Sequence, residues 1–136
     1  MKSMLLEQKS LPTTIKIGLF FVFCFFLGGG VGHFISPDAF VRIMPNYISP
    51  GLHLPAVYIS GFFEILGAFG LIHIKTRRWA GYGLIALVIC VTPANVFMWT
   101  HPGLFPEIPE SILGARLFMQ VLLLLSIAWA TQDRSE

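Results

Sequence analysis

The chain has 136 residues, of which 55% are hydrophobic and only 12% are charged. Its mean hydropathy is +0.75. A soluble domain of this length needs a far more polar surface, so the composition excludes a water-soluble globular protein. The net charge of +2, with no basic cluster that contains interleaved aromatic residues, excludes a nucleic-acid partner. The composition therefore predicts one compact membrane domain.

Four apolar segments divide the chain, at about residues 14–34, 55–74, 79–98 and 112–130. Each is close to the roughly 20 residues that cross a hydrocarbon core about 30 Å thick. All four should be helices, because a backbone in lipid must satisfy its own hydrogen bonds. We therefore expect an all-α, integral membrane four-helix bundle over residues 14–130, with tails at 1–13 and 131–136.

The first segment also has features of a signal peptide, because Lys16 precedes an apolar core. However, the apolar run continues to Ile35, and the glycine-rich stretch 28–32 offers no A-x-A-like cleavage signal. We therefore expect the segment to be retained as a membrane span.

Basic side chains predict the orientation of the bundle. Seven lie in or beside the tails and in the connection between the second and third spans: Lys2, Lys9, Lys16, Lys75, Arg77, Arg78 and Arg134. Only Arg42 and Arg116 lie on the other side. By the positive-inside rule, both termini are cytoplasmic. We expect a multi-pass protein of the cell inner (plasma) membrane.

The two outer connections have different local signals. In the first, Ser36 can cap a helix, Pro37 suits its first position and Asp38 complements its positive end. Phe40, Ile43 and Met44 give it a short apolar face, so we expect a short interfacial helix over residues 37–44 on the outer side, lying over the bundle. The second connection, 99–111, contains three prolines, which favour an extended path.

Polar side chains interrupt the apolar segments at His33, Glu64, Asn95, Arg116 and Gln120. At about 1.5 Å of rise per residue, Glu64 lies roughly 13 Å and Gln120 roughly 12 Å from the outer edge. All five fall in the outer half of the bundle. A charge near the bilayer centre costs a few kcal/mol and usually faces the protein interior. The depths predict a polar pocket that opens outward and narrows to Glu64.

Two interpretations fit Glu64 and Arg116. They could form a charged pair that binds or protonates a ligand, or an interhelical strut that sets the register of the bundle. Gly61, Gly67 and Ala68 flank Glu64 at helical spacing, so this helix face can pack closely under either interpretation.

The histidines and Asn95 leave similar alternatives. His33 could shuttle a proton or donate to a ligand, or it could bond a backbone carbonyl at the interface. Asn95 follows Pro93, whose kink could open a cavity or could only bend the helix. His101, in an outer connection, is a further candidate ligand-binding residue. With His33 and His53 it shows no metal-ligand spacing, so we expect no metal site.

Cys24 and Cys90 fall at similar depth in the first and third spans. Without a C-x-x-C motif or an electropositive setting, they are better interpreted as small core residues than as a redox pair. The aromatic stripe over residues 20–26 is most simply a lipid-facing surface.

Several short motifs together carry a family resemblance. They are Gly32-His33-Phe34; Pro37, Phe40 and Ile43-Met44-Pro45; Ser60-Gly61 with Glu64-Ile65-Leu66-Gly67; Thr76-Arg77-Arg78 with Ala80-Gly81; Pro93-Ala94-Asn95-Val96 with Met98; and Arg116-Leu117 with Gln120. Over residues 27–129 the chain thus resembles the DoxX-like family of small four-helix membrane proteins.

The resemblance implies a membrane bundle whose signature polar positions are His33, Glu64, Asn95, Arg116 and Gln120. Family members are tied to thiosulfate oxidation with quinone as acceptor, to membrane redox and detoxification assemblies and, among distant eukaryotic relatives, to receptor assembly. A quinone-linked oxidoreductase component is therefore one implied role. The chain has no cysteine pair that would argue for thiosulfate chemistry by itself.

Two functions of different class follow. In the first, the bundle binds a quinone or a similar lipophilic ligand: Arg116 and His33 bond its oxygens, and Glu64 exchanges a proton. In the second, the protein is a non-enzymatic interaction or assembly protein and the polar network is structural. An exposed small-residue face at Ala80, Gly81 and Gly83 would then support oligomers. The expected partners are the lipid bilayer, a small lipophilic molecule, redox partner subunits or a second copy of the chain.

Overall fold

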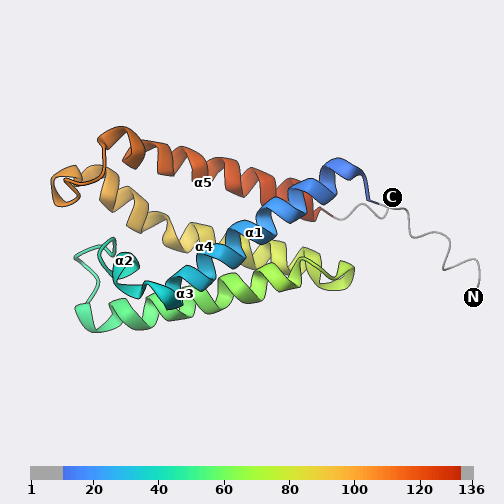
Figure 1. Ribbon diagram of the computed structural model, residues 1–136, viewed down its shortest axis with the longest axis horizontal. Helices are drawn as coiled ribbons and strands as arrows, with labels where there is room; N and C mark the ends of the chain where they lie inside the picture. The colour runs from blue at the N-terminus through green and yellow to red at the C-terminus, as the bar shows by residue number, and fades with distance from the viewer. Residues whose placement is uncertain (1–10, 133–136) are drawn as a thin grey trace, which may run out of the picture.

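The computed structural model describes residues 11–132, and every regular element in that range is a helix. The elements are α1 (Thr13–Ile35), α2 (Pro37–Val41), α3 (Pro50–Gly70), α4 (Ile74–Thr100), the short 3₁₀ helix η1 (Pro102–Leu104) and α5 (Glu110–Thr131) (Figure 1). The all-α prediction is confirmed for this part of the chain. The predicted tails, 1–13 and 131–136, lie largely outside the described residues.

Four of these helices, α1, α3, α4 and α5, are long and apolar enough to cross a membrane, with 23, 21, 27 and 22 residues. They indicate a multi-pass membrane protein. The largest difference from the predicted bounds is in α3, which runs over Pro50–Gly70 instead of 55–74. Pro50 occupies the first turn of α3, where its missing N–H costs no helical hydrogen bond, so the helix begins before the apolar run does.

The connections also differ in detail from the predictions. Helix α2 is five residues long and ends at Val41, before the predicted end at residue 44. Ser36 precedes α2 without a capping hydrogen bond from its side chain. The second connection contains η1 and is therefore not extended throughout. Pro102 begins η1, because the fixed φ of proline also suits a 3₁₀ turn.

The turn between α3 and α4 is closed by side chains that reach the free carbonyls of α3. Thr76 Oγ1 donates to the oxygen of Gly70 at 2.7 Å, and Arg77 Nε donates to the oxygen of Leu71 at 2.9 Å. Cationic donors complement the negative end of a helix. The turn makes α3 and α4 antiparallel neighbours.

Helices α1 and α4 cross the bundle diagonally (Figure 1). Helix α1 begins beside the end of α5, where Gly18 leaves room for Trp129. It finishes against α3, where Gly30 lies on Gly61. Helix α4 begins beside the end of α3 and finishes beside α5. At the end that carries α2 and η1, here called the loop end, the bundle is therefore two helix pairs, α1/α3 and α4/α5. At the opposite, terminal end, all four long helices come together.

The crossing of α1 and α3 depends on two glycines. A Cβ atom on Gly30 would lie 2.8 Å from the backbone oxygen of Gly61, and one on Gly61 would lie 2.6 Å from Cβ of His33. Small residues allow two helix backbones to approach this closely. The close approach holds His33 of α1 directly over α3.

Two apolar clusters hold the bundle together. The terminal core draws on all four long helices: Ile15, Leu19, Val22, Phe26, Ala68, Leu71, Leu84, Val88, Leu123, Ile127 and Ala130. The loop-end cluster contains Phe97, Met98, Phe105 and Leu113, with Ile43 and Ile108 packed against it. Lipid is as apolar as these side chains, so dispersion contacts in tight packing stabilise the clusters more than exclusion of water does.

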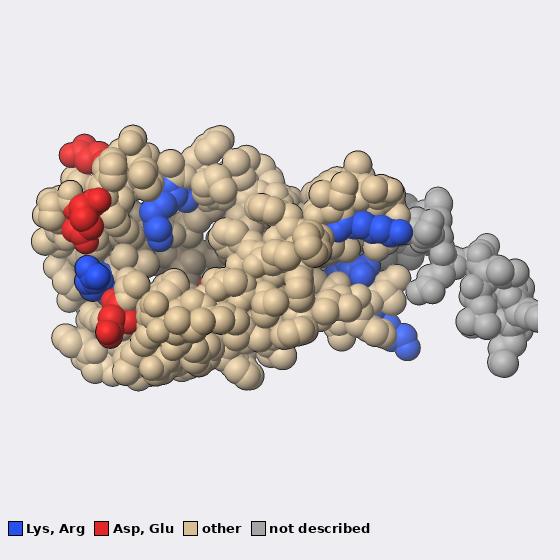
Figure 2. Space-filling model, viewed as in Figure 1, with Lys and Arg blue, Asp and Glu red and all other residues tan. Residues whose placement is uncertain are grey.

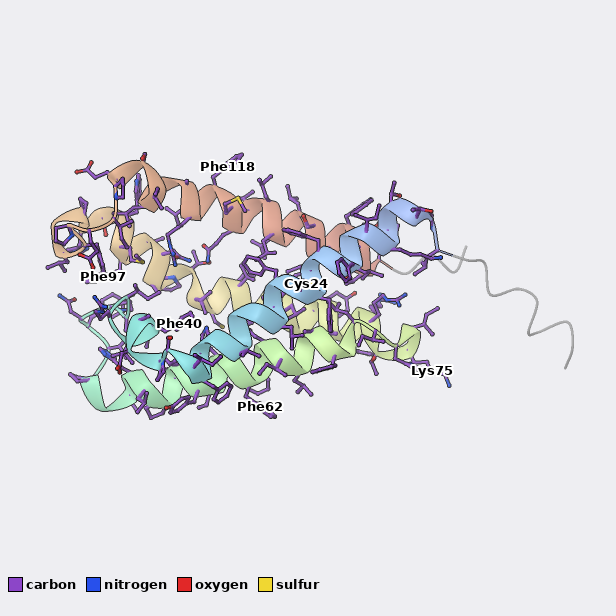
Figure 3. The ribbon with its side chains drawn as sticks, viewed as in Figure 1. Cys24, Phe40, Phe62, Lys75, Phe97 and Phe118 are labelled. Atoms are coloured by element: carbon purple, nitrogen blue, oxygen red, sulfur yellow. The ribbon has the colours of Figure 1, made fainter. Side chains whose placement is uncertain are left out.

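Charged side chains lie mainly at the two ends of the bundle, and Figure 2 shows the visible acidic groups at the loop end. Lys16, Lys75, Arg77 and Arg78 belong to the terminal end, and Asp38, Arg42, Glu107 and Glu110 to the loop end. Between the ends, large apolar side chains face outward. Phe62 and Phe118 are 56% and 64% exposed and point away from the bundle on opposite sides (Figure 3). This surface is consistent with contact with a lipid bilayer.

Two surface predictions need correction. The small-residue face proposed for oligomers is partly internal, because Gly81 packs on Thr131 of α5 and Ala80 packs on Gly70 of α3. The aromatic stripe over 20–26 is also not wholly lipid-facing, because Phe26 is buried in the terminal core. Both errors have one cause: the diagonal course of α1 and α4 turns different faces inward along their lengths.

Candidate functional site

A cavity of about 1250 Å³ separates the two helix pairs in the loop half of the bundle. Figure 2 shows the surface hollowed here between α1 and α5. The terminal core forms its floor, and α2 with the residues up to Ile48 covers it at the loop end. Phe40 of α2 lies in this cover (Figure 3), and Pro45 is fully buried. The structure therefore contains a cavity, and a covering segment lies over the end at which the predicted pocket was expected to be open.

One polar contact links α1 to α3 at the cavity wall. The Nε2 atom of His33 lies 3.5 Å from Oε1 of Glu64, and Nδ1 of His33 donates to the backbone oxygen of Val57 at 2.7 Å. The imidazole also packs against Phe40, with ring centroids 3.9 Å apart and ring planes tilted by 34°. Gly29 leaves space for the carboxylate, since a Cβ there would lie 2.8 Å from Oε2 of Glu64. His33 is thus held from three sides and has one nitrogen directed at Glu64.

The hydrogen bond to Val57 determines what the His33–Glu64 contact can do. A carbonyl oxygen only accepts, so Nδ1 of His33 carries a hydrogen and, in the neutral ring, Nε2 is an acceptor. A carboxylate oxygen is also an acceptor. The Nε2–Oε1 contact is therefore favourable only when one proton is present, on the imidazole or on the carboxyl group. The geometry makes His33 and Glu64 a dyad that can hold and release one proton.

A second polar contact links α4 to α5. Nε of Arg116 donates to Oδ1 of Asn95 at 3.1 Å, and both side chains line the cavity. Asn95 lies just after Pro93, in the stretch of α4 that leans toward α5. Asn95 is a neutral amide, and within residues 11–132 no carboxylate pairs with Arg116, so its other guanidinium donors can bind an acceptor in the cavity.

The direct ion pair expected between Glu64 and Arg116 is not formed. Among the described residues, Glu64 pairs with His33 and Arg116 bonds Asn95. Each contact stays within one helix pair, because α1 leans toward α3 and α4 leans toward α5. Glu64 and Arg116 instead line the same cavity from different helix pairs.

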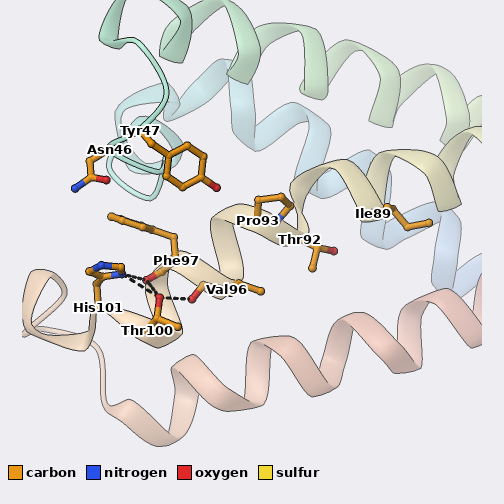
Figure 4. Close-up of a pocket in the computed structure, with 9 residues that line it drawn as sticks. All are labelled: Asn46, Tyr47, Ile89, Thr92, Pro93, Val96, Phe97, Thr100 and His101. Carbon is orange, nitrogen blue, oxygen red and sulfur yellow. Dashed lines mark hydrogen bonds between the residues drawn. The ribbon is translucent and has the colours of Figure 1, made fainter.

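Gln120 lines this cavity too, so all five polar residues found from their depth in the sequence are brought together. His101 is not. It borders a separate pocket of about 770 Å³ beside Asn46 and Tyr47 (Figure 4). There Nδ1 of His101 donates to the oxygen of Phe97 at 3.0 Å and its ring stacks on the Phe97 ring. His101 is the residue that follows the last turn of α4, whereas Asn95 lies inside that helix.

Three features of the cavity wall were not found from the sequence. Cys90 lines the cavity. Both Cys90 and Cys24 are exposed, so neither thiol is the core residue that was expected. Ser60 lines it one turn before Glu64, and that i, i+4 spacing was a usable signal. Phe40 covers it with its ring against His33, a contact that was not expected from the apolar face of that helix. Within the described residues, no group of His, Cys, Asp or Glu is arranged to hold a metal ion.

The fold and site define a class: a small bundle of candidate membrane spans that encloses a mainly apolar cavity with two polar contacts in its wall. The chain belongs to the family described as a domain of unknown function, DUF8561, whose model matches residues 22–133. That match includes all five polar cavity residues. No curated protein and no solved structure matches the chain.

Proposed function

We propose that this protein is a DoxX-like protein of the cell inner membrane whose cavity binds a small lipophilic ligand such as a quinone, as part of a membrane redox or detoxification system. One observation carries the proposal: polar groups from both helix pairs line a single cavity that is otherwise apolar. A few placed polar groups in a concave apolar wall are typical of small-molecule sites.

The two polar contacts suit the two ends of a quinone ring. A guanidinium is a strong donor to a carbonyl oxygen, so Arg116 would bind one ring oxygen from the α4/α5 side. The His33–Glu64 dyad would meet the other oxygen and exchange a proton with it. As an oxidoreductase component, the chain would handle this proton while a redox partner subunit handles the electrons.

The orientation supports such a role at the outer face of the membrane. Lys16, Lys75, Arg77 and Arg78 lie at the terminal end, which the positive-inside rule assigns to the cytoplasm. The cavity lies in the loop half, so the proposal places it toward the extracytoplasmic side. Helix α2 would then lie at the outer interface of the membrane.

Thermal unfolding of the protein in lipid nanodiscs tests the proposal. The probe is a fully substituted 1,4-benzoquinone that carries only methyl and methoxy groups. A ligand at 100 times its Kd stabilises the folded state by about 2.7 kcal/mol, which raises Tm measurably. We expect this rise in the wild type and in Arg42→Met, which removes a charge from a side chain that does not line the cavity. We expect Arg116→Met to lose it. An equal rise in Arg116→Met, or none in the wild type, contradicts the proposal.

The alternative, a non-enzymatic assembly protein, is favoured by a different observation: each polar contact joins two neighbouring helices, as a strut would. Glu64→Gln separates the two functions. A structural dyad predicts a lower Tm in this variant and no quinone-dependent change in any variant. A ligand site predicts quinone binding that Glu64→Gln weakens, because the amide cannot exchange the proton.

A further inference from the structure

The diagonal course of α1 leaves a gap in the side of the bundle. Helix α1 touches α5 near the terminal end, through Gly18 and Trp129, and then moves away toward α3 (Figure 1). In the loop half, the surface between α1 and α5 is hollowed where the cavity lies (Figure 2). This hollow is here called the side opening.

The rim of the side opening is apolar. Phe21 and Phe25 of α1 are 51% and 47% exposed, and Met119 and Leu122 of α5 are 50% and 42% exposed. All four also line the cavity. A side chain that both lines a cavity and faces the exterior marks the edge where the two meet. At this depth the exterior is lipid hydrocarbon, so the side opening connects the cavity to the bilayer.

The two ends of the cavity are closed by packing. At the loop end, Phe40 packs against His33, and Ile43 packs on the loop-end cluster. Arg42 also reaches Glu107 across this end, with Nη1 3.7 Å from Oε1. At the terminal end, the terminal core fills the space between all four long helices. A ligand that came from water would have to displace one of these clusters, whereas one dissolved in lipid would not.

We propose that the ligand is a single-chain amphiphile that enters from the bilayer and keeps its hydrocarbon tail in the side opening. Its polar head binds at Arg116 and the His33–Glu64 dyad, and its tail passes between Phe25 and Leu122 into the surrounding lipid. This inference rests on the proposed function, and it adds the chemical class of the ligand and its route.

The arrangement of polar and apolar groups along α5 matches such a molecule. Leu122 follows Arg116 by six residues, or about 9 Å along the helix. That separation is of the order of one substituted ring, so a head group held at Arg116 brings the start of its tail to the rim. The cavity volume of about 1250 Å³ also exceeds the roughly 300–1000 Å³ of most ligand pockets, which leaves room for part of a chain.

The opposite face, between α3 and α4, is the competing route. There Ile59 of α3 lines the cavity and is 57% exposed, and Cys90 of α4 lines it as well. This edge has fewer large side chains than the side opening. Four half-exposed aromatic or long aliphatic residues can hold a hydrocarbon chain by dispersion contacts, whereas Cys90 offers little surface.

The test compares two ligands that share one fully substituted benzoquinone ring, one without a tail and one with a decyl tail. Binding of each is measured in nanodiscs of one lipid composition, so that partition into lipid is the same for every variant. Leu122→Trp places a large ring in the side opening. Leu125→Trp is the matched control, because Leu125 lies on the same helix, is 63% exposed and does not line the cavity.

We expect Leu122→Trp to weaken binding of the tailed ligand about tenfold and to change binding of the tailless ligand less than about twofold. Leu125→Trp should change neither, and Ile59→Trp should not weaken binding of the tailed ligand more than binding of the tailless one. Two results would contradict the proposal that the tail lies in the side opening: equal effects of Leu122→Trp on both ligands, or selective loss of the tailed ligand in Ile59→Trp. Either result would leave the proposed function intact. Failure of the wild type to bind either ligand overturns both.

A second measurement does not depend on a variant that folds. A diazirine placed on the first carbons of the decyl tail should crosslink to wild-type residues 21–25 of α1 and 119–126 of α5 upon illumination. Crosslinks confined to residues 56–60 of α3 and 90–94 of α4 would place the tail on the opposite face and contradict the inference.

Discussion

Arg116 Nε donates to Asn95 Oδ1 at 3.1 Å, and this bond joins α4 to α5 within one helix pair. The His33–Glu64 contact joins α1 to α3 in the same way. Polar contacts therefore stabilise each pair separately, and the space between the pairs is left to a cavity. A bundle held by a direct bond between Glu64 and Arg116 would have no such space.

The crossing of α1 and α3 should be sensitive to a single methyl group. We expect Gly61→Ala to lower the free energy of unfolding by about 1–3 kcal/mol, because the new Cβ would lie 2.6 Å from Cβ of His33. Reversible unfolding in mixed micelles measures the change. Gly28→Ala is the matched control on α1, since nothing lies within 4 Å of a Cβ at that position. Equal losses in the two variants would show that close packing at the crossing is not the cause, because helix propensity by itself favours alanine over glycine.

The two native thiols should report occupancy of the cavity. Cys24 and Cys90 are both exposed, but only Cys90 lines the cavity. We expect the tailless, fully substituted benzoquinone to slow the reaction of Cys90 with a lipophilic maleimide and to leave the reaction of Cys24 unchanged. Cys24→Ala and Cys90→Ala allow the two rates to be measured one at a time. Equal slowing of both thiols would mean that the quinone acts on the membrane and not on the cavity.

The Arg42–Glu107 ion pair should contribute little to stability. Its side chains are 74% and 61% exposed, and exposed ion pairs are worth about 0–1 kcal/mol. We expect Arg42→Ala to change the free energy of unfolding by less than about 1 kcal/mol. Met98→Ala, in the fully buried loop-end cluster, should cost about 2–5 kcal/mol. If Arg42→Ala proved as costly as Met98→Ala, the covering segment would depend on the ion pair and not on apolar packing.

The orientation is testable in intact cells. In a background without native cysteines, we expect Glu107→Cys to react with a membrane-impermeant maleimide added outside. Lys75→Cys should react only after permeabilisation, because the basic turn is assigned to the cytoplasm. Labelling of Lys75→Cys from outside would show that the bundle has the opposite orientation, with the cavity in the cytoplasmic half.

The polar residues of the cavity were predictable as a set because depth follows from position along a helix. A rise of about 1.5 Å per residue puts Glu64 and Gln120 at one level, whatever the neighbours of each helix are. Partners were not predictable in this way. Which group Glu64 meets depends on the direction in which α1 leans, and that direction follows from glycines that touch across helices, Gly30 on Gly61.

The closure of the loop end and the side opening could not be predicted from local patterns. The helix after the first span was expected to lie over the bundle, but the pocket was still expected to open outward. In the structure Phe40 packs against His33 and Pro45 is buried, so this segment closes the loop end. The prediction that His101 is a ligand-binding residue of this cavity failed for a related reason. His101 lies outside the cavity because of the direction of the last turns of α4, and no short sequence pattern indicates that direction.

The sequence by itself determined that this chain forms apolar helices of membrane-spanning length with five polar side chains near one level. Hydropathy and helical rise are properties of about 20 consecutive residues, and they need no tertiary contact to act. Only the tertiary structure decided that His33 meets Glu64, that Arg116 meets Asn95 and that a cavity lies between them. Those outcomes depend on how the helices cross. Close packing between residues that are far apart in the chain selects these crossings.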